Sequence, residues 1–191
     1  MGVMKWSERL IARELAVGLF AKRLVVVDNC NWTGHECDLL CVTTDMRIVD
    51  VEIKISRADL KADAKKDKWW KRLDYYWQQE RPAPVPRAHP PKVWKHYYAL
   101  PAEIWSDSMF GFLPSPASGV VVLDERKDGS VSHKVLRRAT PNRDASKITP
   151  AQAIDIARLA NLRMWDAYRG LLEAESDSAH WRGLAQQREA A

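Results

Sequence analysis

Two strand-like stretches flank a tight turn at Asp45, and their pairing constrains the fold more than any other feature of the chain. Residues 35–43 and 47–56 both have strand-forming composition. Paired residues in an antiparallel hairpin have a constant index sum, so a turn centred on Asp45 places Asp38 directly opposite Glu52. The sequence therefore predicts a hairpin that brings two carboxylates together.

The second of these strands alternates between apolar and charged residues. Successive side chains of a strand point to opposite sides of the sheet. One predicted face carries Val49, Val51 and Ile53, and the other carries Asp50, Glu52 and Lys54. The apolar face indicates a central strand packed on helices, where polar residues on the other face need a reason.

The opposed carboxylates and the lysine suit phosphodiester chemistry. Two facing carboxylates repel each other, and a divalent cation between them reverses the sign of that interaction. Magnesium prefers oxygen ligands, polarises phosphoryl oxygens and lowers the pKa of bound water. Lys54 returns to the face of Glu52, where it would orient or deprotonate the attacking water or stabilise developing charge. A Glu-x-Lys on a strand is by itself usually a solvated face.

Residues 7–22 are predicted to form a helix with Ser7 as its N-cap. Its apolar stripe comprises Ile11, Ala12, Leu15, Ala16 and Leu19. Glu8 falls along the middle of this stripe, and two interpretations stay open. It is either a third carboxylate for the metal, or an exposed first-turn acid that complements the helix dipole.

Length and composition indicate one globular domain. The chain has 191 residues, 46% of them hydrophobic, and a net charge of +5, which permits a nucleic-acid partner. No apolar run is long enough to cross a bilayer, so no membrane association is expected. Three clustered cysteines argue against a disulfide framework and favour a reducing, cytoplasmic location.

The residues that carry this chemistry also resemble a known family. Asp38 followed by Glu52-Ile53-Lys54 resembles the core of the PD-(D/E)XK nuclease superfamily. The run VEIKISRADLKAD at residues 51–63 is similar to MmcB-like DNA repair proteins and related phage and bacterial proteins. The similarity appears again in KKDKW at 65–69 and in YYALP at 97–101, and it spans roughly residues 5–125.

The resemblance implies an α/β fold with a restriction-endonuclease-like core, in which helices flank a four-stranded mixed central sheet. It implies a DNA phosphodiesterase that uses magnesium, with manganese as an alternative ion. Asp38, Glu52 and the Ile53 carbonyl would bind the metal and Lys54 would assist the water. Glu8 carries over more weakly as a further metal ligand. A homodimer is a further expectation, since many relatives are dimers.

The segment after the charged strand is predicted to be a helix from Arg57 towards Tyr76. Asp59 lies near its start as an auxiliary acid, and Glu36 flanks Asp38 as another. The helix is either a solvated face with internal ion pairs or a ridge that contacts DNA phosphates. The lysines of that ridge are Lys61, Lys65, Lys66 and Lys68.

Cysteine and histidine residues near the first strand of the hairpin raise the alternative of a zinc site. Cys30, His35, Cys37 and Cys41 match no paired Cys-x-x-Cys spacing. Strand alternation predicts Cys37 and Cys41 on the face away from Asp38, so small buried cysteines are the better interpretation. His96 and His133 have no visible partner in the sequence.

Residues 1–175 are predicted to form one nuclease-like domain with a Pro-rich loop at 82–91, and 176–191 a polar tail. The last helix is expected from residue 151 to about 173. The proline-rich loop and the region after 125 fall outside the resemblance. Two other functions stay open, namely a non-catalytic nucleic-acid-binding module with the nuclease fold and a partner-binding protein whose acidic hairpin faces water.

Overall fold

The computed structural model describes residues 5–71 and 83–189, and side chains as far as Arg182. Its α-helices separate two groups of strands along the chain. In order they are α1 (Glu8–Val17), β1 (Val25–Cys30), β2 (Cys37–Val42), β3 (Ile48–Ile53), α2 (Arg57–Ala62), β4 (Trp70–Lys71), β5 (Val85–Pro86), β6 (Lys95–Pro101), β7 (Gly119–Glu125), β8 (Val131–Arg137) and α3 (Pro150–Glu189). Four short 3₁₀ turns are η1 (Asp63–Lys65), η2 (Asp67–Trp69), η3 (Ala102–Ile104) and η4 (Asp107–Phe112).

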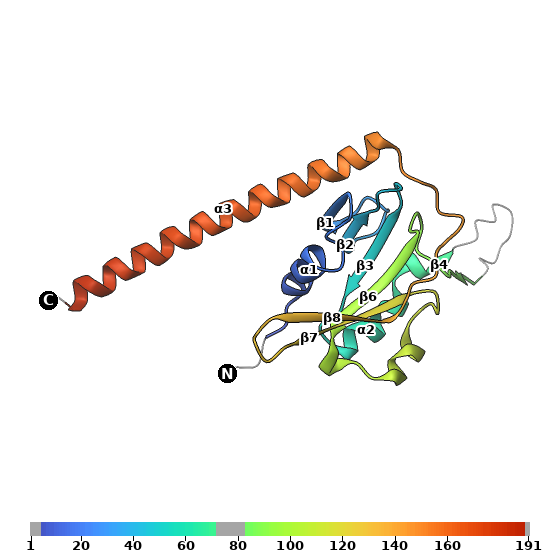
Figure 1. Ribbon diagram of the computed structural model, residues 1–191, viewed down its shortest axis with the longest axis horizontal. Coiled ribbons are helices and arrows are strands. Elements are labelled where there is room, and N and C mark those ends of the chain that lie inside the picture. The colour runs from blue at the N-terminus through green and yellow to red at the C-terminus, as the bar shows by residue number, and fades with distance from the viewer. Residues whose placement is uncertain (1–4, 72–82, 190–191) are drawn as a thin grey trace.

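A mixed six-stranded sheet forms the centre of the molecule, with strand order β1-β2-β3-β6-β7-β8. β1, β2 and β3 form an antiparallel meander, whereas β6 lies parallel to both β3 and β7, and β8 closes the far edge antiparallel to β7. Helices flank this sheet (Figure 1). The expected α/β class with a mixed, helix-flanked sheet is confirmed, with two strands more than the resemblance implied.

The hairpin register agrees with the sequence prediction. Leu39 pairs with Val51 and Cys41 with Val49, so the index sum is constant. Asp38 and Glu52 are the next pair in this register, at the end of the ladder. Thr43 and Met46 close the turn, with Met46 in the left-handed region at φ 64°. The predicted register is confirmed over the ladder, and one position further it brings Asp38 opposite Glu52.

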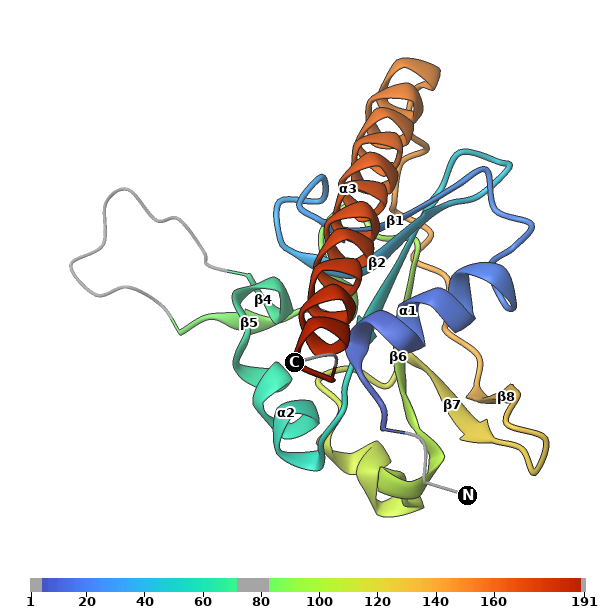
Figure 2. The ribbon, with the colours of Figure 1, turned by 90° about the vertical axis from the view of Figure 1, so that its left-hand side faces the viewer.

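One face of the sheet packs against α1 (Figure 2). Ser7 caps this helix by accepting a hydrogen bond from the Leu10 amide. The apolar face of β3 and the helix residues Ile11 and Leu15 belong to one buried cluster. Its sheet residues include Leu39, Cys41, Val49, Val51, Ile53, Ala99 and Val121.

The other face of the sheet carries two separate apolar clusters. One lies under the first turns of α3, where Ala153 and Ile156 cover Leu40, Val42 and Ile48. The second lies under α2 and the short turns, and comprises residues such as Leu60, Trp69, Tyr98, Leu100, Met109 and Val120. The charged residues of β3 continue this face beyond Ile48, between the two clusters.

The helix predicted from Arg57 to Tyr76 is much shorter than expected. α2 ends at Ala62, and the chain continues as η1 and η2 before the short strand β4. Lys66 has extended geometry, with ψ 138°, which separates the two turns and breaks the helix. Residues 72–76 of the predicted helix lie outside the described residues. β4 pairs with β5, so part of the proline-rich segment is strand.

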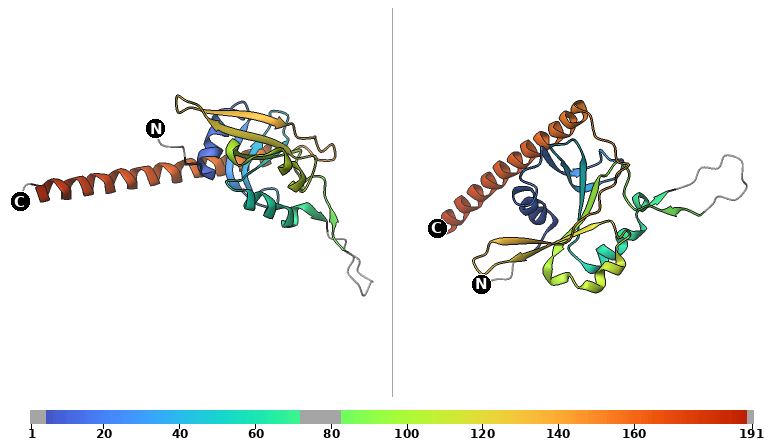
Figure 3. Two further views of the ribbon diagram at one scale, coloured as in Figure 1. Left: turned by 90° about the horizontal axis from the view of Figure 1, so that it is seen from below. Right: turned by 45° about the vertical axis from the view of Figure 1, so that its right-hand side comes forward.

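The last helix is longer than predicted. α3 has 40 residues and continues to Glu189, so the helix end predicted near residue 173 is wrong and the tail predicted from 176 is helical as far as Glu189. At about 1.5 Å per residue this helix is about 60 Å long, and it extends well past the sheet (Figure 3). Beyond Ala160 it has an exposed apolar stripe of Met164, Trp165, Tyr168, Leu171 and Leu172. Among the helices of the described residues, none has both the length and the apolar character to cross a membrane.

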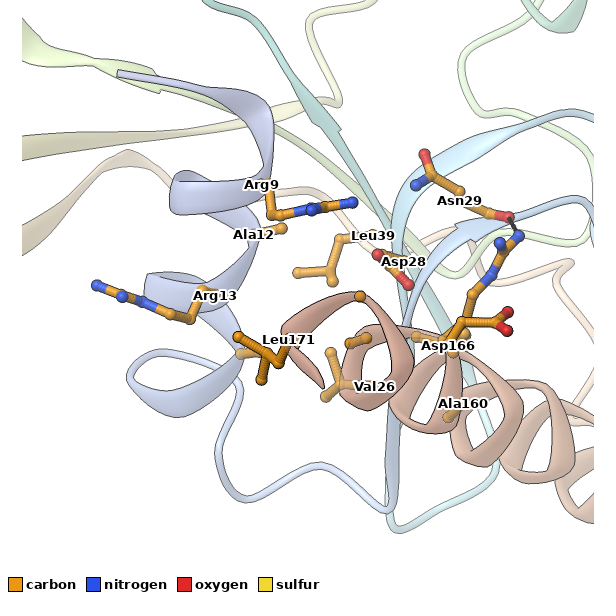
Figure 4. A pocket seen from close by; sticks show the side chains of 15 residues that line it. Arg9, Ala12, Arg13, Val26, Asp28, Asn29, Leu39, Ala160, Asp166 and Leu171 are labelled. Carbon is orange, nitrogen blue, oxygen red and sulfur yellow. Dashed lines mark hydrogen bonds between the residues drawn. The ribbon is translucent and has the colours of Figure 1, made fainter. Parts of the chain in front are cut away.

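A groove of about 1010 Å³ separates α3 from α1 above the edge strand β1 (Figure 4). Arg9 and Arg13 line it from α1, and Arg163 from α3. The Arg163 guanidinium donates to the Asn29 carbonyl at 3.4 Å, which ties α3 to the end of β1. The groove lies beside the apolar cluster under α1, away from the charged face of β3.

Candidate functional site

Glu52 is the centre of a buried ionic cluster on the charged face of β3. Its side chain is 0% exposed. The ammonium groups of Lys54 and Lys66 both lie 2.9 Å from Oε2, and that of Lys68 contacts Oε1. Burial alone would raise the pKa of Glu52, but these lysines hold it below its ordinary value. Glu52 is therefore a carboxylate at neutral pH.

Asp63 is a second carboxylate of this cluster, supplied by η1. Its Oδ2 accepts hydrogen bonds from Tyr98 Oη and from Trp69 Nε1. Its Oδ1 lies 3.0 Å from Lys66 Nζ and 3.4 Å from Lys54 Nζ. Burial opposes ionisation, but the lysines and hydrogen bonds outweigh it and lower the pKa of Asp63. This acid thus fixes both lysines against the sheet.

Asp50 lies two residues before Glu52 on β3, on the same face of the sheet, and is also fully buried. His35 Nε2 is 3.1 Å from its Oδ2, and His96 Nε2 and Lys68 Nζ are each 3.9 Å from that oxygen. Burial opposes the charge, yet the His35 hydrogen bond and these neighbouring groups lower the pKa of Asp50 to about 2. Burial lowers the pKa of His96 to about 4, so its imidazole is neutral at pH 7.

Asp38 lies at the edge of the cluster, where β2 begins. Its Oδ2 accepts a 2.7 Å hydrogen bond from the Ile53 amide, which takes the place of a ladder bond. Burial and the negative charge of Glu52 raise the pKa of Asp38 to about 6, although Lys54 and Lys66 oppose this. Burial is the larger cause of this rise, and the nearby Glu52 carboxylate adds to it.

Lys54 is a buried cation at this site, and its side chain is 4% exposed. Burial would lower the pKa of its ammonium, but Glu52 and Asp63 raise it above the ordinary value. A protonated Lys54 cannot deprotonate water. Its surroundings instead favour a role in stabilising the negative charge that develops on a phosphate.

The remaining predicted site residues lie at different distances from this cluster. Glu8 is exposed in the first turn of α1, whose helix packs on the opposite face of the sheet, so the exposed-acid interpretation is confirmed. Glu36 is exposed before β2 begins. Asp59 lies at the rim, where its Oδ1 is 3.7 Å from Lys54 Nζ.

The predicted lysine ridge separates into two kinds of residue. Lys61 and Lys65 are exposed, and Lys61 Nζ lies 4.2 Å above the Phe112 ring. Lys68 is only 6% exposed, and its ammonium forms an ion pair with Glu52. The prediction that it contacts DNA from a solvent-facing position is therefore wrong. Lys66 is half-exposed, with its ammonium turned into the cluster. The broken helix causes this difference, because the extended Lys66 folds η2 back over the sheet.

The sequence reasoning missed several members of the cluster. The alternation of β3 predicts the face of Asp50 but no role for it. Asp63 falls in the predicted helix, whose charged face is expected either to be solvated or to contact phosphates. His35 and His96 come from separate segments, and the prediction that His96 lacks a partner is wrong. The alternation of β3 was the available signal for Asp50. The contacts of His35 and His96 with Asp50 join residues 15 and 46 positions apart, and the contact of Lys66 with Glu52 joins residues 14 apart, so no local pattern reports them.

The oxygen ligands implied for magnesium fit a hard dication in kind. Asp38 and Glu52 offer carboxylates of like charge. Burial is the main cause of the raised pKa of Asp38, and repulsion from Glu52 is the second cause, which a cation would relieve. The Ile53 carbonyl is a third oxygen at the same strand end. Because both Glu52 oxygens contact lysines, an ion here must compete with ammonium groups for that carboxylate.

Comparisons with known proteins add to the fold but not to the chemistry. No model of a protein family matches the chain, and no curated protein matches it. Among solved structures it is similar to the SPO1766 protein of unknown function from Silicibacter pomeroyi. The TM-score is 0.53 at 19% identity, covering 90% of this chain and 96% of that one. At this identity the likeness shows a shared fold alone.

Proposed function

We propose that the protein is a magnesium-dependent nuclease that hydrolyses phosphodiester bonds in DNA. One observation carries the proposal: Asp38 follows the β2–β3 register to a position opposite Glu52, with Lys54 on the face of Glu52. A half-buried acid opposite a buried one, beside a charged lysine at a strand end, has the composition of a hydrolytic phosphate site. The resemblance of residues 51–63 to MmcB-like DNA repair proteins supports DNA repair or phage DNA metabolism as the setting.

In this proposal the chain's own residues bind the ion and balance charge. Asp38, Glu52 and the Ile53 carbonyl would hold magnesium, which supplies Lewis-acid activation of phosphate and of water. Lys54 is held protonated by Glu52 and Asp63, so it stabilises negative charge that develops on the phosphate. Lys66 is half-exposed and also contacts Glu52, which lets its ammonium exchange between the carboxylate and an incoming phosphate.

Binding of the DNA backbone is proposed to come from exposed lysines near the ionic cluster rather than from the cluster itself. Lys61 and Lys65 are exposed on α2 and η1, close in sequence to the ionic cluster, and the chain has a net charge of +5. Such lysines contact phosphates without reading sequence, so binding should weaken steeply with salt. Three buried free thiols support a reducing, cytoplasmic setting for this activity.

Cleavage of branched, flapped and single-stranded DNA in the presence of magnesium tests the proposal. Wild type should cut at least one substrate, and Asp38→Asn should reduce the rate by about 10²-fold or more, as losses of preorganised charge do. Asp124→Asn, at an exposed position on β7, is the matched control and should leave the rate unchanged. Equal rates for wild type and Asp38→Asn, or no cleavage of any substrate, would contradict it.

A second candidate is a nucleic-acid-binding module that keeps the fold without turnover. The observation that favours it is the contact of both Glu52 oxygens with lysines, which can satisfy this carboxylate without a metal. Calorimetric titration with magnesium separates the two. The enzyme requires a saturable binding heat that Asp38→Asn removes, whereas the binding module gives salt-dependent DNA binding that magnesium leaves unchanged.

A further inference from the structure

Three potential metal ligands lie close together beside the ionic cluster around Glu52, where the chain enters β2. The ligand atoms of His35, Cys37 and Asp50 all lie within 4.8 Å of one another. His35 Nε2 and Asp50 Oδ2 are 3.1 Å apart. Cys37 and Asp50 are both 0% exposed, and the His35 side chain is 15% exposed. The three residues thus form a nearly closed set of one nitrogen, one sulfur and one oxygen.

Unpartnered polar atoms point to a ligand at this position. Asp50 Oδ1 is buried and has no hydrogen-bond partner among the residues that the structure describes. His96 Nε2 is likewise buried and without a hydrogen bond there, 3.9 Å from Asp50 Oδ2. His96 Nδ1 is 3.0 Å from Ser118 Oγ, which holds the ring in place. Buried polar atoms are rarely left unsatisfied, and an absent ion is one of the standard explanations.

We propose that His35, Cys37 and Asp50 bind a divalent transition metal of the zinc class. Imidazole and thiolate favour zinc over magnesium, which prefers oxygen ligands throughout. Metal–ligand bonds of about 2.0–2.3 Å in a tetrahedron separate ligand atoms by about 3.5 Å. The spacing between His35 and Asp50 is close to this value, and the third ligand lies within reach of both. The inference is independent of the proposed nuclease activity.

Charge balance supports a dication at this site. The three ligand atoms are Cys37 Sγ, a ring nitrogen of His35 and a carboxylate oxygen of Asp50. On binding, a bond forms between the metal and Sγ, and the thiol proton leaves to solvent. The thiolate and the Asp50 carboxylate then neutralise the two positive charges. Lys68 keeps its contact with Glu52 and is not needed as a counter-ion to Asp50.

The fold also explains why Cys37 takes part and Cys41 does not. The expected alternation is broken before β2, because Cys37 and Cys41 lie in different buried clusters on opposite faces of the sheet. Thr33 holds the turn that presents the ligands, since its hydroxyl donates to the His35 carbonyl at 2.9 Å and lies 3.4 Å from Cys37 Sγ. Cys41 is therefore a matched control for Cys37, with the same burial but the opposite face.

Titration of the full chain with cobalt(II) tests the site. We expect one cobalt ion per chain with a thiolate-to-cobalt charge-transfer band, displaced by zinc and unaffected by excess magnesium. Cys37→Ser should abolish the charge-transfer band, while Cys41→Ala keeps it. His35→Gln, at the most exposed ligand, should weaken cobalt binding by at least about tenfold. Circular dichroism of each variant confirms that the fold is retained.

Several results would overturn the proposal. These are the absence of a charge-transfer band in wild type, a band that survives Cys37→Ser, equal losses in Cys37→Ser and Cys41→Ala, or unchanged affinity in folded His35→Gln. Asp38→Asn separates this site from the proposed nuclease site. It should remove magnesium-dependent cleavage and leave the cobalt band intact, so each proposal can fail without the other.

Discussion

The two faces of β3 are equally buried but stabilised by different interactions. On one face Val49, Val51 and Ile53 pack under α1 in an apolar cluster. On the other face Asp50, Glu52 and Lys54 are just as inaccessible to solvent, at 3% exposure or less. Alternation on a strand normally separates core from solvent. Here it separates an apolar core from an ionic one, whose charges are balanced by residues from η1, η2 and β6.

The comparison teaches that the polar half of an alternating strand need not face water. An uncompensated buried charge costs several kcal/mol, so each acid on this face requires a partner of opposite charge or a hydrogen-bond donor. The apolar face tolerates small adjustments in packing, whereas the ionic face depends on a few individual atoms. Substitutions should therefore affect the two faces through different mechanisms.

The largest effect is expected from Lys68→Met. The substitution keeps the length of the side chain but removes the ammonium that contacts Glu52 and lies near Asp50. Removing one partner of a buried ion pair costs about 3–5 kcal/mol. Urea unfolding should show this loss, whereas Lys65→Met at an exposed position should stay within about 0.5 kcal/mol of wild type. Equal costs for the two variants would refute an ionic core.

Leu15→Ala probes the apolar face and is expected to cost about 3 kcal/mol, because it leaves a cavity under α1. Its effect should be independent of pH, since no titrating group is removed. In the double variant with Lys68→Met, the two losses of unfolding free energy should sum to within about 0.5 kcal/mol, because the two sites lie on opposite sides of the sheet. A strong departure from additivity in unfolding experiments would mean that the faces are coupled.

Tyr98→Phe removes one hydrogen bond from the ionic face while keeping the aromatic ring. Asp63 would lose one of the two donors to its Oδ2 and keep Trp69. A hydrogen bond to a charged group contributes about 1.5–3 kcal/mol, so we expect a loss near 2 kcal/mol. Tyr97→Phe is the matched control on the opposite face, where the ring packs against Phe20. If both variants have the same stability, Asp63 does not depend on Tyr98.

Asp38→Asn should change how stability depends on pH. The folded-state pKa of Asp38 is about 6, above the ordinary value of 3.8, so the folded protein binds this proton more tightly than the unfolded chain. The contribution is favourable at low pH and is lost as pH rises through about 6. Unfolding free energies of wild type and variant should therefore diverge in favour of the variant between about pH 4 and 6.

The opposite sign applies to Asp50 and Asp63, whose pKa values are lowered in the folded protein. Their contribution is present above about pH 4 and is lost as pH falls through their folded-state pKa values. Wild type and Asp38→Asn should therefore both lose stability in acid. A constant difference between wild type and Asp38→Asn from about pH 4 to 7 would mean that burial and Glu52 do not raise the pKa of Asp38.

The smallest effect is expected on α3, which lies outside both faces of β3. Trp165 is 60% exposed in the apolar stripe of the projecting helix. Trp165→Ala should change the unfolding free energy of the monomer by no more than about 0.5 kcal/mol, as exposed substitutions usually do. A loss that grows with protein concentration would instead identify the stripe as a self-association surface, and analytical ultracentrifugation would detect it.

Those parts of the fold that depend on local patterns were predictable from the sequence. The index sum fixed the pairing of Asp38 with Glu52, and alternation separated the faces of β3. The break after Ala62 was not predicted, because a Lys- and Trp-rich segment suits a helix and gives no local signal for the extended Lys66. The burial of Lys68 follows from that break. The length of α3 was not predicted, because the polar composition of its second half suggested that the helix ends near residue 173.

Two further residues lie where periodicity alone does not place them. Glu8 follows the apolar stripe of its helix in angle, but it sits in the first turn, beyond the edge of the packed cluster, and stays exposed. Cys37 was expected on the face of Cys41, yet the turn held by Thr33 rotates it towards Asp50. Both outcomes depend on where neighbouring segments end, and strand or helix periodicity does not encode that.

The central claim is that the ionic face of β3 is a site for phosphate chemistry and not only a buried ion network. The most direct measurement is magnesium-dependent cleavage of a DNA panel by Lys54→Met alongside Lys65→Met, with folding of both confirmed by circular dichroism. The account predicts that Lys54→Met stays folded and loses about 10²-fold or more in rate, while Lys65→Met cleaves at close to the wild-type rate. A folded Lys54→Met that cleaves as fast as wild type would contradict it.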